Sequence, residues 1–462
     1  MEKLLGLLIL VVYNCLQTSA RPQSRQPEQV HLSLGVKPSQ MVVTWLTQDD
    51  VNATVMVEYG TQLGQYQYQA LGQTTVFVDG GAGQTVRYIH RAKMVVAPGQ
   101  RYFYHVGSNA GWSNMFYFNT LPAGTNISYK VCIFGDLGIV NGVSFGRLQR
   151  DAQRGAFDLV IHVGDFAYDL SAENGTWGDQ FMRQIEPIAA YVPYMVVAGN
   201  HEETYNYSNY VNLFTMPNSS DNQYYSFDMG PVHFVALSTE YYGFFYKYGL
   251  TPVFNQFKWL NDDLAKANQN RDNVPWILTY MHRPLYCSNE NSEECMGLDN
   301  DLIRNGVPGV PGLEDTFNTH AIDFGFWGHE HSYERMWPVY NRNVYNQSAD
   351  PYHNAPAPIY VVTGSAGCYS LHAGFDQDPA PWSAVRALDY GYSILTVYNY
   401  THLYLQQISD DKNGAVIDSL WITKDRNHYY NAVYRNSLRS VHIPKPKRSE
   451  NHVFMDDSNE IH

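Results

Sequence analysis

Between about residues 29 and 121 the chain alternates apolar and polar residues over short stretches. These stretches occupy residues 30–34, 41–45, 54–59 and 101–106, and turn-forming residues separate them. Alternation with a period of two places one face of a strand in a core and the other in solvent, and several such strands in series are typical of a β-sandwich. The pattern therefore predicts an all-β sandwich domain over residues 27–122, with Trp45 in its core.

The pattern changes after Gly124 to apolar runs that alternate with segments of helical periodicity. Strands are predicted at residues 129–134, 159–163, 194–198, 232–237, 276–280 and 322–327, and helices at 145–154, 177–190 and 253–267. Buried strands that alternate with helices indicate a layered α/β domain, which we place at residues 127–437. Its C-terminal portion, residues 358–437, returns to strands and is expected to complete a second sheet rather than to form a separate domain.

The two ends of the chain differ from the part between them. Residues 1–20 combine a charged start, an apolar run at 4–16 and the small residues Thr18, Ser19 and Ala20, which predicts a cleaved signal peptide. The apolar run is too short to cross a bilayer, which requires about 20 residues. No other window is long enough, and residues 438–462 form a polar tail, so we predict no membrane span and a location outside the cell or in the lysosome.

Sequons and cysteines agree with export. Cys287 and Cys295 are close enough in sequence to form a local disulfide, whereas Cys132 and Cys368 could pair or could be small buried residues. Seven Asn-x-Ser/Thr sequons are candidate glycosylation sites: Asn52, Asn126, Asn174, Asn206, Asn218, Asn346 and Asn399. The net charge of −14, from 44 acidic and 30 basic residues, makes nucleic acid an improbable partner.

Five of the predicted strands in the α/β part end just before side chains that can bind metal. In open α/β sheets ligands bind beyond the carboxyl ends of the strands, so these side chains should meet at one rim. A single Gly-Asp or Gly-Asn-His sequence is more often a turn, but an ordered set predicts a metal site. In chain order the candidates are Asp136, Asp165 with Tyr168, Asn200, His282, and His329 with His331.

These motifs resemble those of the purple acid phosphatases, within the calcineurin-like metallophosphoesterase superfamily, and most closely its animal type 7 relatives. The resemblance spans nearly the whole mature chain. It implies a four-layer α/β/β/α sandwich, and the segment 98–104 of the domain in front resembles a strand of fibronectin type III domains. It implies a ferric ion held by Asp136, Asp165, Tyr168 and His331. It implies a second, divalent ion (Zn, Fe or Mn) held by Asp165, Asn200, His282 and His329.

The ligand types agree with this assignment, because phenolate and carboxylate suit a hard trivalent ion and imidazole and amide suit a divalent one. Tyr168 is the distinguishing ligand. In the protein phosphatase branch a histidine follows the first aspartate by two residues, but here that position is Gly138. Although 37 of 462 residues are tyrosine, the coincidence of Tyr168 with the missing histidine favours a ligand over chance.

The resemblance implies a secreted acid phosphatase that hydrolyses small phosphate monoesters by attack of a metal-activated hydroxide. A phosphodiesterase or nucleotidase with the same metals, and a non-catalytic secreted binding protein, are the alternatives. His201 is the candidate to contact the phosphate or protonate the leaving oxygen, and its alternative role is structural. Plant members carry further histidines in the loop after His282, which here runs from Cys287 to Cys295, so a second acid–base group is not assigned.

Overall fold

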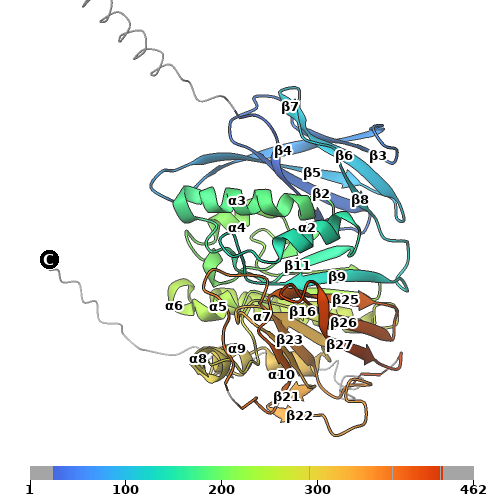
Figure 1. The fold of residues 1–462 in the computed structure, drawn as a ribbon, viewed down its shortest axis with the longest axis vertical. Coiled ribbons are helices and arrows are strands. Elements are labelled where there is room, and N and C mark those ends of the chain that lie inside the picture. The colour runs from blue at the N-terminus through green and yellow to red at the C-terminus, as the bar shows by residue number, and fades with distance from the viewer. Residues whose placement is uncertain (1–23, 291, 377, 427, 430–462) are drawn as a thin grey trace, which may run out of the picture.

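The computed structural model describes residues 24–290, 292–376, 378–426 and 428–429. The predicted signal peptide at 1–20 and the polar tail at 438–462 lie outside the described residues. Within this part of the chain, the N-terminal β domain sits against one side of a larger body of two sheets flanked by helices (Figure 1). No helix in the described ranges is both long enough and apolar enough to cross a membrane.

The N-terminal domain is built from eight strands that curl into a sandwich. The strand order is β1-β2-β5-β4-β3-β6-β7, with β8 paired to β6, and β4 pairs with both β5 and β3. The sheet therefore folds over along β4 and closes on a core in which Trp45 is 1% exposed. The predicted all-β domain is confirmed. The strands are β1 (Glu28–Leu34), β2 (Gln40–Thr47), β3 (Met56–Gly60), β4 (Tyr68–Val78), β5 (Val86–Val95), β6 (Arg101–Ser108), β7 (Gly111–Trp112) and β8 (Phe116–Asn119).

The first sheet of the α/β part has the order β13-β11-β9-β25-β26-β27. Its first three strands are parallel, and their apolar residues are buried on both faces, as expected for parallel strands. Helices α2 (Phe145–Gln153) and α3 (Ala172–Ala189) cover the face that looks toward the N-terminal domain (Figure 1). The strands are β9 (Tyr129–Phe134), β11 (Leu159–His162), β13 (Tyr194–Val196), β25 (Gly391–Val397), β26 (His402–Ser409) and β27 (Ala415–Thr423).

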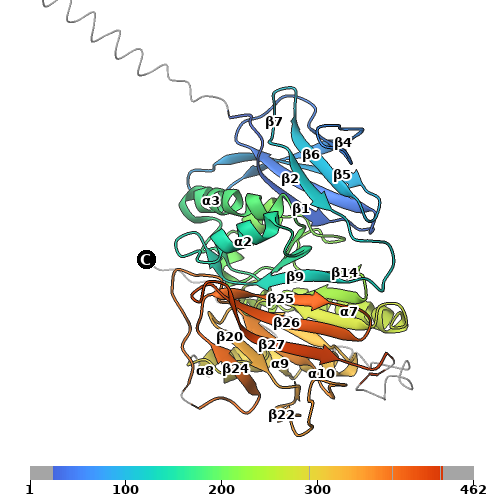
Figure 2. The same ribbon diagram turned by 45° about the vertical axis from the view of Figure 1, so that its right-hand side comes forward.

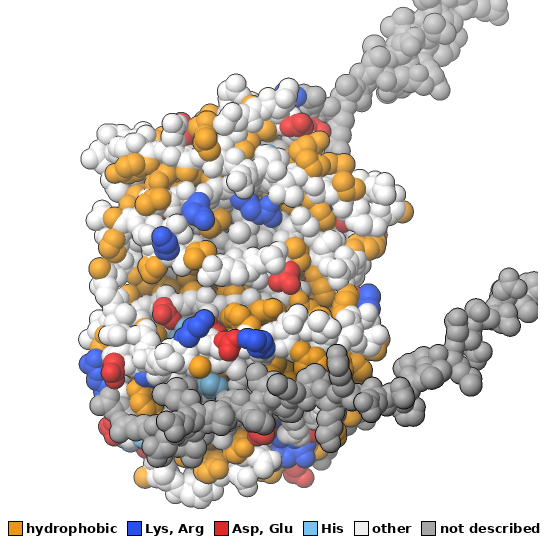
Figure 3. Space-filling view, turned by 180° about the vertical axis from the view of Figure 1, so that it is seen from behind, with side chains coloured by type: hydrophobic (Ala, Val, Ile, Leu, Met, Phe, Trp, Pro, Cys, Tyr) orange, Lys and Arg blue, Asp and Glu red, His pale blue; other side chains and the backbone are white. Residues whose placement is uncertain are grey.

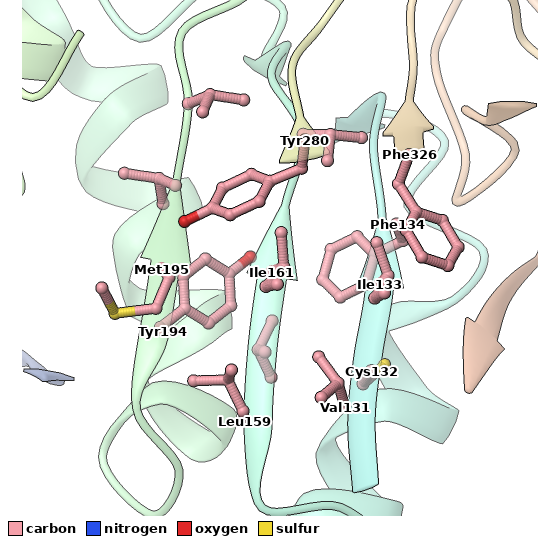
Figure 4. Packing of buried hydrophobic residues seen from close by; sticks show 14 of the residues in the cluster. Val131, Cys132, Ile133, Phe134, Leu159, Ile161, Tyr194, Met195, Tyr280 and Phe326 are labelled. Atoms are coloured by element: carbon pink, nitrogen blue, oxygen red, sulfur yellow. The ribbon is translucent and has the colours of Figure 1, made fainter. Parts of the chain in front are cut away.

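The second sheet has the order β14-β15-β16-β19-β23-β20-β24 and packs face to face on the first. In Figure 4, Tyr280 and Phe326 of the second sheet lie beside Ile161 and Phe134 of the first. Ile277 and its neighbours on the opposite face pack on the outer helices. The strands are β14 (Tyr225–Met229), β15 (Val232–Ala236), β16 (Trp276–Tyr280), β19 (Phe324–Trp327), β20 (Tyr333–Met336), β23 (Ile359–Thr363) and β24 (Ser383–Ala387), and the outer helices are α7 (Thr251–Gln269), α9 (Leu298–Arg304) and α10 (Glu314–Thr319).

The layers run α/β/β/α, which confirms the predicted fold class. The strands at the C-terminal end do more than complete one sheet, because β23 and β24 join the second sheet while β25, β26 and β27 join the first. Figure 2 shows β25 beside β9, with β26 and β27 following outward. The expectation of a single second sheet was too simple, since strand pairing depends on long-range contacts that local alternation does not encode.

Short elements complete the fold and shape the loops around the strand ends. On the face shown in Figure 3, the described Lys, Arg, Asp and Glu side chains are interspersed rather than separated by sign. The remaining elements are β10 (Leu137–Gly138), β12 (Phe166–Ala167), η1 (Asn200–Glu202), α4 (Ser208–Leu213), α5 (Glu240–Gly243), α6 (Phe245–Tyr248), α8 (Ser292–Met296), β17 (Gly306–Val307), β18 (Val310–Pro311), β21 (Val339–Tyr340) and β22 (Asn343–Val344).

Candidate metal centre

The structure brings all seven candidate ligands together, at the matching ends of two sheets rather than at the rim of one. Strands β9, β11 and β13 of the first sheet lead to Asp136, to Asp165 with Tyr168, and to Asn200. Strands β16 and β19 of the second sheet lead to His282 and to the pair His329 and His331. Face-to-face packing of the sheets therefore creates the site.

One half of the site contains a phenol, a carboxylate and an imidazole. The Tyr168 hydroxyl lies 3.2 Å from Asp136 Oδ1 and 3.0 Å from His331 Nε2. His331 Nε2 lies 3.4 Å from the same Asp136 oxygen. These three donor atoms face a common point, as the ligands of one cation do.

The other half contains two imidazoles and an amide. His282 Nε2 lies 3.0 Å from Asn200 Oδ1 and 3.1 Å from His329 Nδ1. It also lies 3.3 Å from Asp165 Oδ2. Asp165 belongs to both halves, because its carboxylate groups with His282 and His329 on one side and with Asp136 and His331 on the other, ligand atoms within 4.8 Å of one another.

The backbone at these strand ends is unusual. Asp136, Asp165, Tyr168 and His329 have φ values of 62°, 58°, 55° and 71°. Non-glycine residues rarely adopt this left-handed region, and where they do the strain often marks a functional site. The left-handed backbone therefore coincides with four of the seven candidate ligands.

Two glycines allow the ligands to come this close. A Cβ atom on Gly328 would lie 2.3 Å from Asp136 Oδ2, and one on Gly199 would lie 2.2 Å from Asp165 Oδ1. Any side chain at either position would displace a carboxylate of the site. These glycines precede ligands in the sequence because they leave space for other ligands, in addition to permitting a sharp turn.

The Tyr168 ring occupies the space beside Gly138, the position that holds a histidine in the protein phosphatase branch. A Cβ atom on Gly138 would lie 3.2 Å from Tyr168 Cδ2, and strand β10, which contains Gly138, pairs in parallel with β12 just before Tyr168. The side chain of Tyr168 is 4% exposed. Burial and the nearby charge of Asp136 raise the pKa of its phenol well above the usual value.

The buried carboxylates of the site favour binding of a cation. Asp136 is 0% exposed and Asp165 is 2% exposed, and among the described residues only imidazoles lie within ion-pair distance of their carboxylates. Burial opposes ionisation of Asp165, but His282 and the other nearby imidazoles outweigh this effect and lower its pKa. Buried carboxylates are otherwise neutralised by a basic side chain or a metal ion, so the donor set suits the metal pair that the resemblance implies.

His201 lies at the mouth of the site beside Tyr168. Their ring centroids are 4.5 Å apart, and the His201 side chain is 29% exposed. His201 Nδ1 lies 2.6 Å from Asp169 Oδ1. Burial disfavours the imidazolium, but the hydrogen bond and charge of Asp169 outweigh this and raise the pKa of His201 to about 9. Nε2 is the ring nitrogen left for a substrate.

Sequence reasoning missed three acidic residues that hold the site together. The side-chain oxygens of Glu202 accept hydrogen bonds from the backbone N–H groups of Asp165, Phe166 and Gly199 at 2.8 to 2.9 Å. Asp169 is the partner of His201, and Glu294 lies against His329. Glu202 lies three residues after Gly199 and accepts its N–H, but glycine has no side chain to complete the reciprocal capping pattern, so the sequence offered no clear local signal.

The cysteines and sequons are placed as follows. Cys287 and Cys295 form a disulfide, whereas Cys132 and Cys368 are buried free thiols and do not pair. Cys368 Sγ lies 2.9 Å from His331 Nδ1. Of the sequon asparagines, two are half-buried, Asn174 and Asn399, and five are exposed: Asn52, Asn126, Asn206, Asn218 and Asn346.

Three family models match consecutive parts of the chain. Residues 27–120 match "Purple acid Phosphatase, N-terminal domain", residues 129–333 match "Calcineurin-like phosphoesterase", and residues 357–419 match "Iron/zinc purple acid phosphatase-like protein C".

Similar proteins agree with these matches. Acid phosphatase type 7 of Mus musculus is 46% identical over 402 residues, which covers 86% of this chain and 91% of the relative. The Homo sapiens protein of the same name is 46% identical over 421 residues, covering 90% and 95%. A purple acid phosphatase structure from yellow lupin (Lupinus luteus) seeds has a TM-score of 0.76 and 25% identity, covering 91% of this chain and 78% of that one. The chain therefore belongs to the purple acid phosphatase family of calcineurin-like phosphoesterases and is an acid phosphatase.

Proposed function

We propose that this acid phosphatase is a secreted or lysosomal enzyme that hydrolyses small phosphate monoesters at a two-metal centre. The observation that carries the proposal is the arrangement of two donor groups around the shared carboxylate of Asp165, with Tyr168 in one of them. A ferric ion would be held by Asp136, Asp165, Tyr168 and His331. A divalent ion, Zn, Fe or Mn, would be held by Asp165, Asn200, His282 and His329.

The ligand chemistry of the two halves supports different metals. Burial and the charge of Asp136 raise the pKa of the Tyr168 phenol, so only a strongly polarising cation would displace its proton. The half with His282, His329 and Asn200 offers neutral nitrogen and oxygen donors that suit a divalent ion. When bound, two such cations would supply the positive charge that binds the ester phosphate and the Lewis acidity that activates water as the nucleophile.

His201 is proposed to assist departure of the alcohol. Its Nδ1 is engaged by Asp169, so the proton available to the substrate is on Nε2. As the P–O bond of the ester breaks, Nε2 donates this proton to the leaving oxygen. The hydrogen bond from Asp169 keeps the ring oriented and favours its protonated form in acid.

The test compares two substrates and one variant. p-Nitrophenyl phosphate should be hydrolysed in acid far faster than its bis ester, and removal of both metals should abolish turnover. Faster hydrolysis of the bis ester would instead indicate a phosphodiesterase. His201→Ala should lower kcat by about 10² to 10⁴ while both metals stay bound; full turnover in that variant would remove the catalytic role.

Secretion is supported by the Cys287–Cys295 disulfide and by the exposed sequons. The full-length chain expressed in cultured cells should appear in the medium or in lysosomes, and its mass should fall on treatment with an N-glycosidase. An unglycosylated, cytosolic product would contradict this part of the proposal.

A further inference from the structure

Each proposed histidine ligand turns one ring nitrogen toward the metal site and the other toward a partner. His282 directs Nε2 into the site, and its Nδ1 lies 2.8 Å from the carbonyl oxygen of Val163. His331 also directs Nε2 inward, and its Nδ1 lies 3.1 Å from the carbonyl oxygen of Leu371. A carbonyl only accepts hydrogen bonds, so Nδ1 of His282 is protonated and its Nε2 has the free lone pair. Nδ1 of His331 also lies 2.9 Å from the Cys368 thiol, so both of these partners of His331 are uncharged.

His329 has the opposite orientation and a charged partner. Its Nδ1 faces the site, 3.1 Å from His282 Nε2, while its Nε2 lies 2.5 Å from Glu294 Oε2. Arg283 Nη1 lies 3.4 Å from the same nitrogen, but a guanidinium can only donate. Glu294 is therefore the acceptor for Nε2–H, and Nδ1 keeps the lone pair that a metal requires.

A disulfide holds the segment that carries Glu294. Glu294 lies in α8, next to Cys295, whose disulfide partner Cys287 follows β16 and His282 in the chain. Both cysteines are buried: Cys287 is 0% exposed and Cys295 is 4% exposed. Cys295 Sγ lies 3.8 Å from Oε1 of Glu330, the residue between His329 and His331 in the sequence. The disulfide thus holds the backbone of Glu294 close to the ends of β16 and β19, the two strands that lead to His282 and His329.

We propose that Glu294 is a positioning residue for the divalent ion, because its carboxylate fixes His329 in the Nε2-protonated tautomer and strengthens binding through Nδ1. The inference rests on the two-metal function proposed above. Loss of such a partner typically lowers metal affinity by about 10- to 100-fold. The ferric half should not respond, since Nδ1 of His331 lies against the Leu371 carbonyl and the Cys368 thiol and not against Glu294.

The experiment measures metal affinity rather than turnover. Iron-loaded full-length wild-type protein, Glu294→Gln and Glu294→Ala are titrated with Zn(II) against a chromogenic chelator. The glutamine variant retains an acceptor oxygen but loses the charge, so its Zn(II) affinity should fall by about 10-fold, and the alanine variant by up to about 100-fold. Asp299→Asn, which removes an exposed carboxylate at the start of α9, is the matched control and should bind like wild type.

A second measurement reports on the tautomer of His329. In protein loaded with Co(II) in place of Zn(II), the ring N–H of His329 should give a shifted, slowly exchanging proton signal in wild type that Glu294→Ala loses. Iron content and visible absorption should be the same in all variants.

Each outcome decides a specific point. Unchanged Zn(II) affinity in both Glu294 variants would overturn the assignment, and so would equal loss of iron and zinc. Failure of wild type to bind any divalent ion would overturn the two-metal function itself, which the wild-type titration alone reveals.

Discussion

The clearest quantitative prediction concerns the buried ion pair that joins the N-terminal domain to the catalytic domain. Arg87 of β5 donates from Nε and Nη2 to the two carboxylate oxygens of Asp179 in α3, both at 2.9 Å. Gln29 donates to the same carboxylate at 3.0 Å. The two charged side chains are 2% and 8% exposed, so removing one leaves the other charge buried without its ion-pair partner.

The expected cost follows from that burial. Removing one member of a buried pair costs about 3–5 kcal/mol, whereas replacing both members by apolar residues of similar volume is often close to neutral. Arg87→Met and Asp179→Leu should each lower the free energy of unfolding by that amount. The double variant should be less destabilised than the sum of the single variants, with a coupling energy of a few kcal/mol.

The assay is urea unfolding followed by tryptophan fluorescence, with kcat for p-nitrophenyl phosphate measured at 25 °C in parallel. None of the described hydrogen bonds of this pair reaches a metal ligand, so folded single variants should keep wild-type kcat. Additive effects, or single variants within about 0.5 kcal/mol of wild type, would show that the pair does not hold the domains together.

Two further predictions concern the pH dependence of stability and the space inside the site. Burial disfavours the charged form of His233, but hydrogen bonds to Asp228 and Asp263 outweigh this and raise its pKa from 6.5 to about 9. The raised pKa corresponds to a contribution of about 3 kcal/mol to the free energy of unfolding, which is complete below pH 6.5 and is lost as pH rises to 9. In thermal unfolding curves, the difference in stability between wild type and His233→Gln should therefore shrink over that interval. Gly328→Ala should displace Asp136, and metal analysis should show lost iron together with a fall of about 10² in kcat/KM; a variant with normal iron would contradict the steric argument.

Local patterns predicted those elements whose apolar runs are short and clearly bounded. The strands expected at 129–134 and 276–280 have the observed limits of β9 and β16. The helix expected from 177 corresponds to α3, whose residues Glu173, Asn174 and Gly175 have left-handed backbone, so regular helix begins close to the expected position. Because both faces of such a strand are buried, its apolar run can be recognised in the sequence without knowing which strands lie beside it.

The parts that were not predicted depend on contacts between distant segments. The ligand residues could be proposed because each directly follows a strand, but their origin in two sheets could not be foreseen. The contact of Glu294 with His329 could not be predicted, because the two residues are 35 positions apart in the sequence. They meet because the Cys287–Cys295 disulfide holds the segment of Glu294 near the site. The same is true of Asp169 and His201, whose pairing depends on the path of the loop after β12.

The visible absorption of the purified, iron-loaded protein shows whether Tyr168 binds the iron. Wild type should be violet or pink, because the Tyr168 phenolate transfers charge to Fe(III), and Tyr168→Phe should lose this absorption while metal analysis still finds one iron per chain. A wild-type protein that contains iron but is colourless, or a Tyr168→Phe variant that keeps the colour, would contradict the assignment of Tyr168 as the iron ligand.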